Sequence, residues 1–526
     1  MADGMTLSQV NSALAGGQSL GSLLRETCTH AWAEQEAVLR NILSYGSTCT
    51  YGTLWGFDGI DGYEAFCASV PVTDYSDYLG YIEAMKDGAE DVLFPGRARS
   101  FVVSTGTTGI PKYIPESAAG ALAKSLVSRM RAFEWKRLIP DAELPERKYL
   151  PVTNAAVYEV TAGGIPAGSA SGLSAVSRKQ AKKTRKAIPD ALLTIAGLSR
   201  DAMDYLTMLF SIAEPEVAKL ACNNVAHFYL LWQLAQERAT DIVGDIRSGT
   251  LSADLEPADR ATLMECWAPN PARADELECL LRDDGTLRIE RVWPHFQAVV
   301  CWIGGSVGRA AREYRTLFPA GTTFINWGYG ASEGKFDVPT EAESTEGLLT
   351  LFGYFYEFLE PGAKTPVPLW EARDGVPYEL VLTSYSGFYR YNIHDLVSLG
   401  TNADGMRTIR FLGKTSDSLE VGGQTLYGGE FLHCIEQYER AHGIFFRLVQ
   451  GTNDGNSLRI LVEGTNDDWD MQAFCAWARE QFGQRGVPFA GVTKLAQGYR
   501  DSLFEKVMDS GKSVNSTKVA VFVKGV

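Results

Sequence analysis

Four short segments of this chain carry groups that could bind a phosphate, a sugar or a divalent cation. The first is STGTTGIPK, from Ser104 to Lys112, at the end of the apolar run FVVS. Its glycines leave backbone N–H groups open, and hydroxyls and the Lys112 ammonium add donors of the kind that surround phosphate oxygens. It lacks the Walker spacing GxxxxGK[ST], and its composition also suits a plain turn. The candidate phosphate-binding residues are Ser104, Thr105, Gly106, Thr107 and Thr108.

The second segment is NWGYGASEG, at 326–334, after the apolar run TTFINW. Tyr329 could stack on a purine, with Gly330 beside it, and Ser332 could donate to a phosphoryl oxygen. Glu333 supplies a hard oxygen ligand of the kind that magnesium prefers. A glutamate after such a turn can also serve only as a charge at a helix start, so the segment alone does not decide between the two.

The third segment is SGFYRYNIHDLVSLG, at 386–400. Asp395 could accept hydrogen bonds from both hydroxyls of a ribose, and Arg390 could bind a phosphate or carboxylate with its planar guanidinium. Beside them, His394 has the chemistry of a base, but a lone histidine is more often structural or exposed. The alternative is an aspartate-containing turn over a core-covering tyrosine pair.

The fourth segment is the tail GKSVNSTKVAVFV, at 511–523. Lys518 stands at the head of an apolar run that predicts a strand. Movement of a small domain could bring its ammonium onto a distant anion. The alternative is a solubilising charge at a sheet edge.

The elements that must position these residues alternate between helix and strand. Apolar residues at helical spacing between Leu7 and Leu43 predict an amphipathic helical entry. Strand-like runs then recur between helical stretches, at 101–104, 298–303, 322–327, 378–384 and 408–412. This alternation predicts an α/β fold, with a large amino-terminal domain of several parts and mostly parallel sheets.

A glycine-rich stretch, GKTSDSLEVGGQTLYGGE, follows and predicts a flexible joint. Beyond it the pattern predicts a small mobile α+β domain, so we divide the chain into residues 1–414 and 415–526. The predicted elements are a helix at 430–441, strands at 445–450 and 458–463, a helix at 468–482 and a last strand at 518–523.

Composition excludes several classes of partner. The 526 residues hold 49 Lys and Arg against 64 Asp and Glu, a net charge of −15 that disfavours nucleic acid and anionic membranes. The basic cluster RKQAKKTRK at 178–186 lacks aromatic residues for base stacking. Long apolar runs, a secretory signal and CxxC pairs are absent, which predicts a soluble cytoplasmic chain. The oligomeric state is left open, and a monomer is compatible with the sequence.

Taken in order, the four segments resemble the adenylate-forming superfamily of acyl-CoA synthetases, peptide adenylation domains and firefly luciferase. STGTTGIPK is similar to its phosphate loop, and YGASE at 329–333 to its adenine and magnesium motif. YSGFYRYNIHDLV and GKSVNSTKV are similar to signatures of the auxin-responsive Gretchen Hagen family of acyl acid amido synthetases. The resemblance extends from about Asp74 to the end of the chain.

The resemblance implies a role for each matching residue. The hydroxyls at 104–108 would contact phosphates, Tyr329 the adenine and Asp395 the ribose, while Ser332 and Glu333 would handle the α-phosphate and magnesium. Lys518 would act at the adenylation transition state. Three departures stand out: His394 replaces a glycine at a turn that could require positive φ, Lys414 replaces a common hinge arginine, and Ala520 and Val521 replace Pro-Arg.

The implied activity is an ATP-dependent and magnesium-dependent ligase that adenylates a small carboxylic acid and transfers the acyl group to an amino acid amine. AMP and pyrophosphate would be released. Two alternatives stay open: an acyl-CoA ligase with the same adenylate intermediate, and a nucleotide-binding scaffold without turnover. The identities of the acid and the acceptor are not given by the sequence.

Overall fold

The amino-terminal segment forms the helical entry that its apolar spacing predicts. The computed structural model describes residues 7–29, 31–105, 111–139, 147–177, 185–195, 197–465, 468–509 and 519–523. The first elements are α1 (Leu7–Ala15), α2 (Leu20–Thr29), α3 (Ala31–Gly46), α4 (Thr50–Leu54), η1 (Phe57–Gly59), α5 (Gly62–Ser69) and α6 (Tyr75–Lys86). On α3, the buried Gln35 amide donates to the carbonyls of Leu351 and Tyr354 at 3.0 and 2.8 Å. These two hydrogen bonds connect the entry helices to a sheet that forms much later in the sequence.

The two strands that flank the candidate phosphate loop pair with each other in antiparallel fashion. Strand β1 (Ser100–Thr105) pairs with β2 (Pro111–Glu116), and a parallel contact to β5 (Pro166–Gly168) and then β4 (Glu159–Val160) completes a four-stranded sheet. Helix α7 (Ala118–Leu138) begins where the Ser117 hydroxyl accepts the Gly120 N–H at 2.9 Å. Its 21 residues include Lys124 and Arg131, which contact the segment of Tyr329 and Ser332.

A second sheet confirms the parallel α/β prediction for the middle of the chain. It is β3-β6-β7-β8, formed by Lys148–Val152, Val217–Cys222, Ala298–Cys301 and Thr323–Asn326, and every pair is parallel. Burial on both faces explains the continuous apolar runs of β7 and β8. Helix α8 (Ala170–Ser177) packs against β1. The helices around the second sheet are α9 (Asp190–Thr194), α10 (Arg200–Ala213), α11 (Val225–Glu237), α12 (Ala239–Ser248), α13 (Pro257–Met264), α14 (Pro271–Asp284), α15 (Ile289–Val292), α16 (Gly305–Glu313) and η4 (Tyr314–Leu317).

The largest sheet is antiparallel, so the expectation of parallel strands is wrong at 378–384 and 408–412. Its order is β12-β11-β13-β14-β15-β10-β9, with every pair antiparallel. The strands are β9 (Asp337–Val338), β10 (Glu346–Leu349), β11 (Tyr354–Leu359), β12 (Val367–Pro368), β13 (Pro377–Ser384), β14 (Tyr391–Thr401) and β15 (Arg407–Lys414). Short connections allow antiparallel pairing, whereas parallel neighbours need a long crossover.

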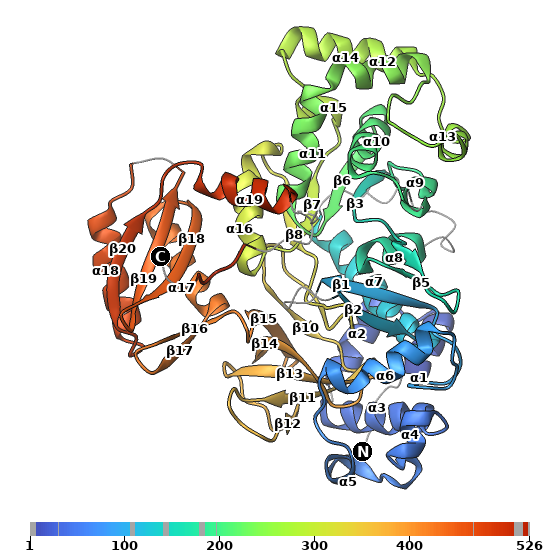
Figure 1. The fold of residues 1–526 in the computed structure, drawn as a ribbon, viewed down its shortest axis with the longest axis vertical. Helices are drawn as coiled ribbons and strands as arrows, with labels where there is room; N and C mark the ends of the chain where they lie inside the picture. The colour runs from blue at the N-terminus through green and yellow to red at the C-terminus, as the bar shows by residue number, and fades with distance from the viewer. Residues whose placement is uncertain are drawn as a thin grey trace.

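The carboxy-terminal residues build a smaller α+β unit with its own apolar core, which runs from Val421 to Val521. It contains a hairpin of β16 (Ser418–Val421) and β17 (Gln424–Tyr427), α17 (Gly428–His442), β18 (Phe446–Asp454), β19 (Ser457–Gly464), α18 (Met471–Gly483), β20 (Phe489–Lys494) and α19 (Tyr499–Asp509). The predicted order of helix, strand, strand and helix is confirmed. In Figure 1 this unit, in orange and red, lies beside the rest of the molecule, with α16 and α19 adjacent at the boundary.

Two features of this unit differ in detail from what the sequence suggests. Most of the stretch predicted as a flexible joint forms the β16–β17 hairpin, which turns at Gly422 and Gly423 with φ of 61° and 76°. The described part of the last predicted strand, 519–523, makes only a single bridge, from Phe522 to Gly451. Within the described residues, no helix combines the length and apolar character that crossing a bilayer requires.

Candidate active site

The phosphate-loop candidates begin at the end of β1. Ser104 lies opposite Lys112 in the antiparallel pair of β1 and β2, and Thr105 lies opposite Pro111. Gly106, Thr107 and Thr108 lie outside the described residues. On β2, the Lys112 ammonium stands 5.1 Å from the centre of the Tyr75 ring at the start of α6. The hairpin therefore holds the first half of the loop and Lys112 next to α6.

The second segment is a turn that connects β8 to β9, and side chains of α7 hydrogen bond to it. The Tyr329 N–H donates to Asp337 Oδ1 at 2.8 Å, and Arg131 of α7 donates to the Tyr329 carbonyl at 2.7 Å. Gly328 has φ of 92°, and a Cβ there would lie 2.6 Å from Asp337 Oδ1, so only glycine fits. Lys124 of α7 donates to the Ser332 carbonyl at 2.9 Å. The turn is thus fixed at both ends.

Arg131 and Asp337 form a buried ion pair under this turn, with a separation of 3.0 Å and side chains 2% and 0% exposed. Burial raises the pKa of Asp337 to about 6 although Arg131 acts against the rise, and burial lowers the pKa of Arg131. Such a pair is costly to break because the remaining charge would be buried alone. It ties α7 to the segment that carries Tyr329 and Glu333.

The third segment brings Asp395 to the same place. Between β13 and β14, residues 393–395 bulge out of register, because Glu379 faces Leu396 while Val381 already faces Asn392. The Tyr329 hydroxyl donates to Asp395 Oδ2 at 2.9 Å, and the Lys414 ammonium forms an ion pair with Asp395 Oδ1. Asp395 is 3% exposed. Strand β15 supplies Lys414 directly opposite Asp395.

Glu333 lies within this group of charges. Burial raises the pKa of Glu333, and Lys414 and Lys112 act against that rise, while Asp395 adds to it. Burial raises the pKa of Tyr391, and the nearby Glu333 carboxylate adds to that rise. For Lys414, burial alone would lower the pKa, but the carboxylates of Asp395 and Glu333 raise it. The group is therefore a cluster of two buried carboxylates and one partly exposed ammonium.

The structure brings together most of the described candidates but not Arg390. Its guanidinium pairs with Glu357 at 2.8 Å and donates to the Val70 carbonyl at 2.8 Å, in a position only 4% exposed. The carboxylate that Arg390 binds is thus one of the chain's own. We therefore withdraw Arg390 as a ligand contact and assign it to linking β11, β14 and the end of α5.

Three residues of the cluster were missed by the sequence analysis or given another role there. Lys414 was noted only as a hinge substitution, and its pairing with Asp395 depends on the β14–β15 register. Tyr391 was taken as core-covering. Phe411 was not considered, yet it stacks on Tyr329 with ring centres 5.3 Å apart and covers one face of the ring that was expected to meet a purine.

Sequence and structure comparisons agree on the kind of protein. The GH3 family N-terminal domain matches residues 22–323, and the GH3 family central domain matches residues 347–414. The chain belongs to the GH3 family. This confirms the resemblance that the four segments suggested, since the family comprises the acyl acid amido synthetases named there.

This GH3 chain is similar to curated relatives in sequence and to solved structures in fold. It is 26% identical over 418 residues to jasmonoyl–L-amino acid synthetase JAR6 of Nicotiana attenuata, covering 74% of this chain and 70% of the relative. It is 25% identical over 548 residues to indole-3-acetic acid-amido synthetase GH3.8 of Oryza sativa subsp. indica, covering 94% and 88%. A structure of AtGH3.15 acyl acid amido synthetase in complex with 2,4-DB matches with a TM-score of 0.77 and 20% identity, covering 100% and 96%.

The tail of this GH3 chain meets the boundary between its two parts. Lys518 lies outside the described residues, but Val519, Ala520 and Val521 line a small cavity of about 50 Å³ together with Ser306 and Arg309 of α16. The Gln450 amide donates to the Ala520 carbonyl at 2.8 Å, and the Gly451 N–H to that of Val521 at 2.9 Å. The tail is thus tied to β18 next to α16.

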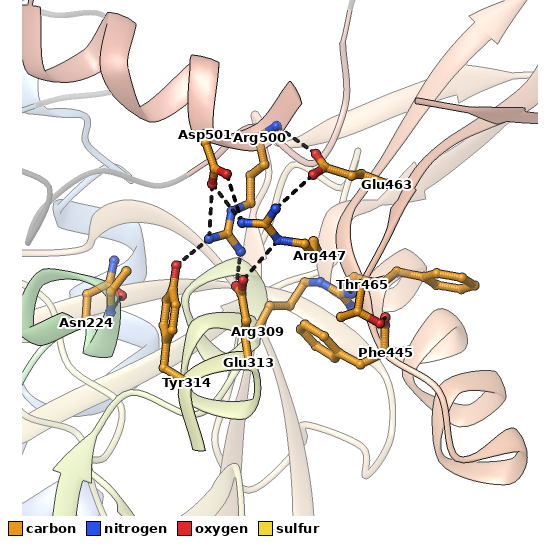
Figure 2. A network of polar contacts seen from close by, with 12 residues as sticks. Asn224, Arg309, Glu313, Tyr314, Phe445, Arg447, Glu463, Thr465, Arg500 and Asp501 are labelled. Carbon is orange, nitrogen blue, oxygen red and sulfur yellow. Dashed lines mark hydrogen bonds and ion pairs between the residues drawn. The ribbon is translucent and has the colours of Figure 1, made fainter. Parts of the chain in front are cut away.

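Charged side chains surround this boundary, as Figure 2 shows. On the α16 side, Arg309 pairs with Glu439 of α17 at 2.6 Å, and Glu313 contacts both Arg447 of β18 and Arg500 of α19. Arg447 also pairs with Asp501 at 2.8 Å. The two parts of the molecule therefore meet through ion pairs as well as apolar contact.

Proposed function

We propose that this chain is an ATP-dependent acyl acid amido synthetase. It activates a small carboxylic acid as an acyl-adenylate and joins it to the amine of an amino acid, with release of pyrophosphate and AMP. Membership of the GH3 family and curated relatives named as amido synthetases support this proposal. The single observation that carries it is the meeting of Glu333, Asp395 and Tyr329, from distant segments, in one cluster.

We place one ATP molecule across this cluster. Asp395 would accept the ribose hydroxyls, and the adenine would lie at Tyr329 with Gly330 close to it. The hydroxyls and N–H groups of Ser104 to Thr108, with Ser332, would surround the phosphates. Lys414 would then exchange part of its ion pair with Asp395 for contact with the nucleotide, since three donors are available on an ammonium.

Magnesium fits the donor set beside this position. Mg²⁺ is usually held by one or two carboxylates together with substrate phosphates, and Glu333 offers a buried carboxylate of that kind. Within the described residues, no group of three or more histidine, cysteine or acidic side chains forms a complete metal cage. When bound, the ion would neutralise the charge between the attacking carboxylate and the phosphates.

In the first step, a carboxylate oxygen of the acid attacks the α-phosphorus and pyrophosphate leaves. Two anions approach each other, so positioned positive charge and N–H groups lower the barrier. The loop after β1 and Lys518 would supply those groups. In the second step, the amine nitrogen attacks the carbonyl carbon of the adenylate, the bond from that carbon to the phosphate oxygen breaks, the nitrogen loses a proton, and AMP leaves.

One experiment tests the proposal against its alternatives. A panel of carboxylic acids is screened for acid-dependent ATP–pyrophosphate exchange, and the products formed with pooled amino acids or with coenzyme A are identified by mass spectrometry. We expect exchange with at least one acid and an amide product. A thioester product would favour an acyl-CoA ligase. ATP binding without exchange for any acid would favour a scaffold.

We also propose that the chain works in the cytoplasm. Every described cysteine is a free thiol, and burial raises the pKa of Cys222 and Cys301, so these thiols stay protonated and unreactive. A reducing compartment suits such a set.

A further inference from the structure

His394 occupies a strained backbone position directly before Asp395. Its φ is 55°, in the left-handed region that favours glycine, and it lies within the bulge that displaces β14 from its register with β13. The Asn392 side chain accepts the His394 N–H at 2.8 Å, and the Thr415 N–H donates to the His394 carbonyl at 3.1 Å. A side chain that persists at such a position calls for a compensating contact.

The imidazole ring supplies that contact, with a carboxylate at each nitrogen. Nε2 lies 2.7 Å from Asp74 Oδ1, and Nδ1 lies 3.4 Å from Glu379 Oε2. A carboxylate accepts the proton of Nε2 and attracts a positive charge at Nδ1, so the imidazolium is the form of the ring that satisfies both contacts. The nearby Glu379 carboxylate is the main cause of a raised His394 pKa, burial acts against it, and Asp74 adds to the rise.

Asp74 lies at the junction between the two halves of the candidate site. Next to it, the Thr73 N–H donates to the Arg390 carbonyl and the Asn392 N–H to the Thr73 carbonyl, each at 2.9 Å, which binds this segment to β14. On its other side, the Tyr75 hydroxyl accepts the Tyr113 N–H at 2.7 Å, which binds it to the hairpin of the phosphate loop. The segment 73–75 thus connects the strand of Asp395 to the hairpin of Ser104.

We propose that His394 is a positioning residue for nucleotide binding: its doubly protonated ring ties residues 73–75 and β13 to the bulge that presents Asp395, and this tie loosens when the ring loses a proton. The inference rests on the proposed function and extends it to a pH dependence. A glycine would adopt the same φ without strain but would leave Asp74 and Glu379 unconnected.

The charged and titratable groups around the ring set the direction of the effect. They are Asp74 before α6, Glu379 on β13, Tyr427 on β17 near Glu379, and Lys414 on β15, whose ammonium donates to the Ile393 carbonyl at 3.3 Å and pairs with Asp395. The nearest charges are both negative. The ring therefore keeps its proton to a higher pH than a free histidine, and the tie is complete below that range and lost above it.

The test measures the dissociation constant of Mg-ATP by calorimetry from pH 6 to pH 9 for the wild type, His394→Asn and His394→Gly. Asparagine and glycine both tolerate the left-handed backbone, but neither carries a charge. His295→Ala is the matched control, since His295 faces Glu216 at 3.9 Å far from the cluster. ATP phosphates titrate near pH 6, so variants are compared with the wild type at each pH.

We expect the two His394 variants to bind about threefold to fivefold more weakly than the wild type at pH 6, the size of a half-exposed ion pair, and equally at pH 9. His295→Ala should match the wild type throughout. Equal binding at pH 6, or a ratio that is the same at every pH, would overturn the inference alone. A wild type that binds no nucleotide at any pH would overturn the proposed function and this inference together. Thermal melting at each pH confirms that the variants are folded.

Discussion

At the scale of single residues, the most specific prediction concerns the effect of Asp395 on ATP binding. Its carboxylate meets Tyr329 and Lys414, and in the proposed function it also accepts ribose hydroxyls. We expect Asp395→Asn to raise the KM for ATP by about tenfold to a hundredfold, because a hydrogen bond to a charged group contributes about 1.5–3 kcal/mol. The measurement is the KM for ATP and for its 2′- and 3′-deoxy analogues.

The deoxy analogues separate a ribose contact from a general loss of structure. In the wild type, removal of a hydroxyl should weaken binding, whereas in Asp395→Asn the same removal should have little further effect. Asp374→Asn is the control, because Asp374 pairs with Arg407 on the same sheet and is half-exposed. If the deoxy penalty is the same in the Asp395 variant as in the wild type, Asp395 does not bind the ribose.

Short motifs supplied Tyr329, Ser332, Glu333 and Asp395 as candidates, and the order of the motifs and their resemblance to a family gave these residues their expected roles. Arg390 could not be resolved in the same way, because its partner Glu357 lies on another strand, 33 residues earlier in the chain. Lys414 was underestimated for the same reason, as its contact with Asp395 exists only through strand pairing. Motifs therefore predict which groups are present, and register decides which of them meet.

At the scale of elements, α7 is the support on which the Tyr329 turn rests. We expect Arg131→Leu to lower the free energy of unfolding by about 3–5 kcal/mol, because Asp337 would be left as a lone buried carboxylate. Denaturant unfolding at pH 7 measures this loss. The loss should shrink as the pH falls toward 6 and level off below it, because Asp337, whose pKa burial raises to about 6 with Arg131 present, is then neutral in both proteins.

The double variant Arg131→Leu with Asp337→Leu serves as the control for this prediction. Removing both side chains leaves no buried charge without a partner, although the Tyr329 N–H and carbonyl each lose a hydrogen bond, so the double variant should be clearly more stable than Arg131→Leu alone. A single variant that is as stable as the wild type at pH 7 would contradict the supporting role of the pair. Arg131→Leu should also raise the KM for ATP, because Arg131 holds the Tyr329 carbonyl.

The elements that the sequence predicted best are those with a strong local pattern. Strands β7 and β8 were found because their continuous apolar runs are typical of buried strands, and the entry helices because their apolar residues recur at helical spacing. The direction of β13 and β15 was missed because a strand-like run of residues does not show whether its neighbours in the sheet are parallel or antiparallel. The β16–β17 hairpin was missed because its glycines resemble a linker, although two of them adopt the positive φ of a tight turn.

At the scale of the whole molecule, the two half-reactions need different arrangements of the carboxy-terminal unit in the proposed function. In that proposal, Lys518 acts in the first step only. We expect Lys518→Ala to slow adenylate formation by about a hundredfold or more, the typical cost of removing one positioned charge, and to leave amide formation from preformed adenylate largely unchanged. Pyrophosphate exchange and single-turnover transfer measure the two steps separately. Equal losses in both would contradict the assignment.

A substitution at the boundary between α16 and the carboxy-terminal unit can change how this unit docks without altering the candidate site. Arg312 is suited to this because the partners of its guanidinium, Glu436 at 2.9 Å and Glu439 at 3.2 Å, both lie on α17 across the boundary. Burial lowers the pKa of Arg312 and the two carboxylates act against that change, so the side chain stays charged at neutral pH. Its removal weakens docking while leaving each part intact.

We expect Arg312→Ala to change the rates of the two half-reactions by different factors. The step that uses the docked arrangement of Figure 1 should slow by about tenfold, because at least one hydrogen bond to a charged group is lost, and the other should be unchanged or faster. Added salt should reproduce part of the effect in the wild type. Arg373→Ala is the control, since its pair with Glu360 is exposed and lies within one part. If both half-reactions slow equally, the ion pairs of α16 do not distinguish the two arrangements, and the carboxy-terminal unit works as a fixed part of one rigid enzyme.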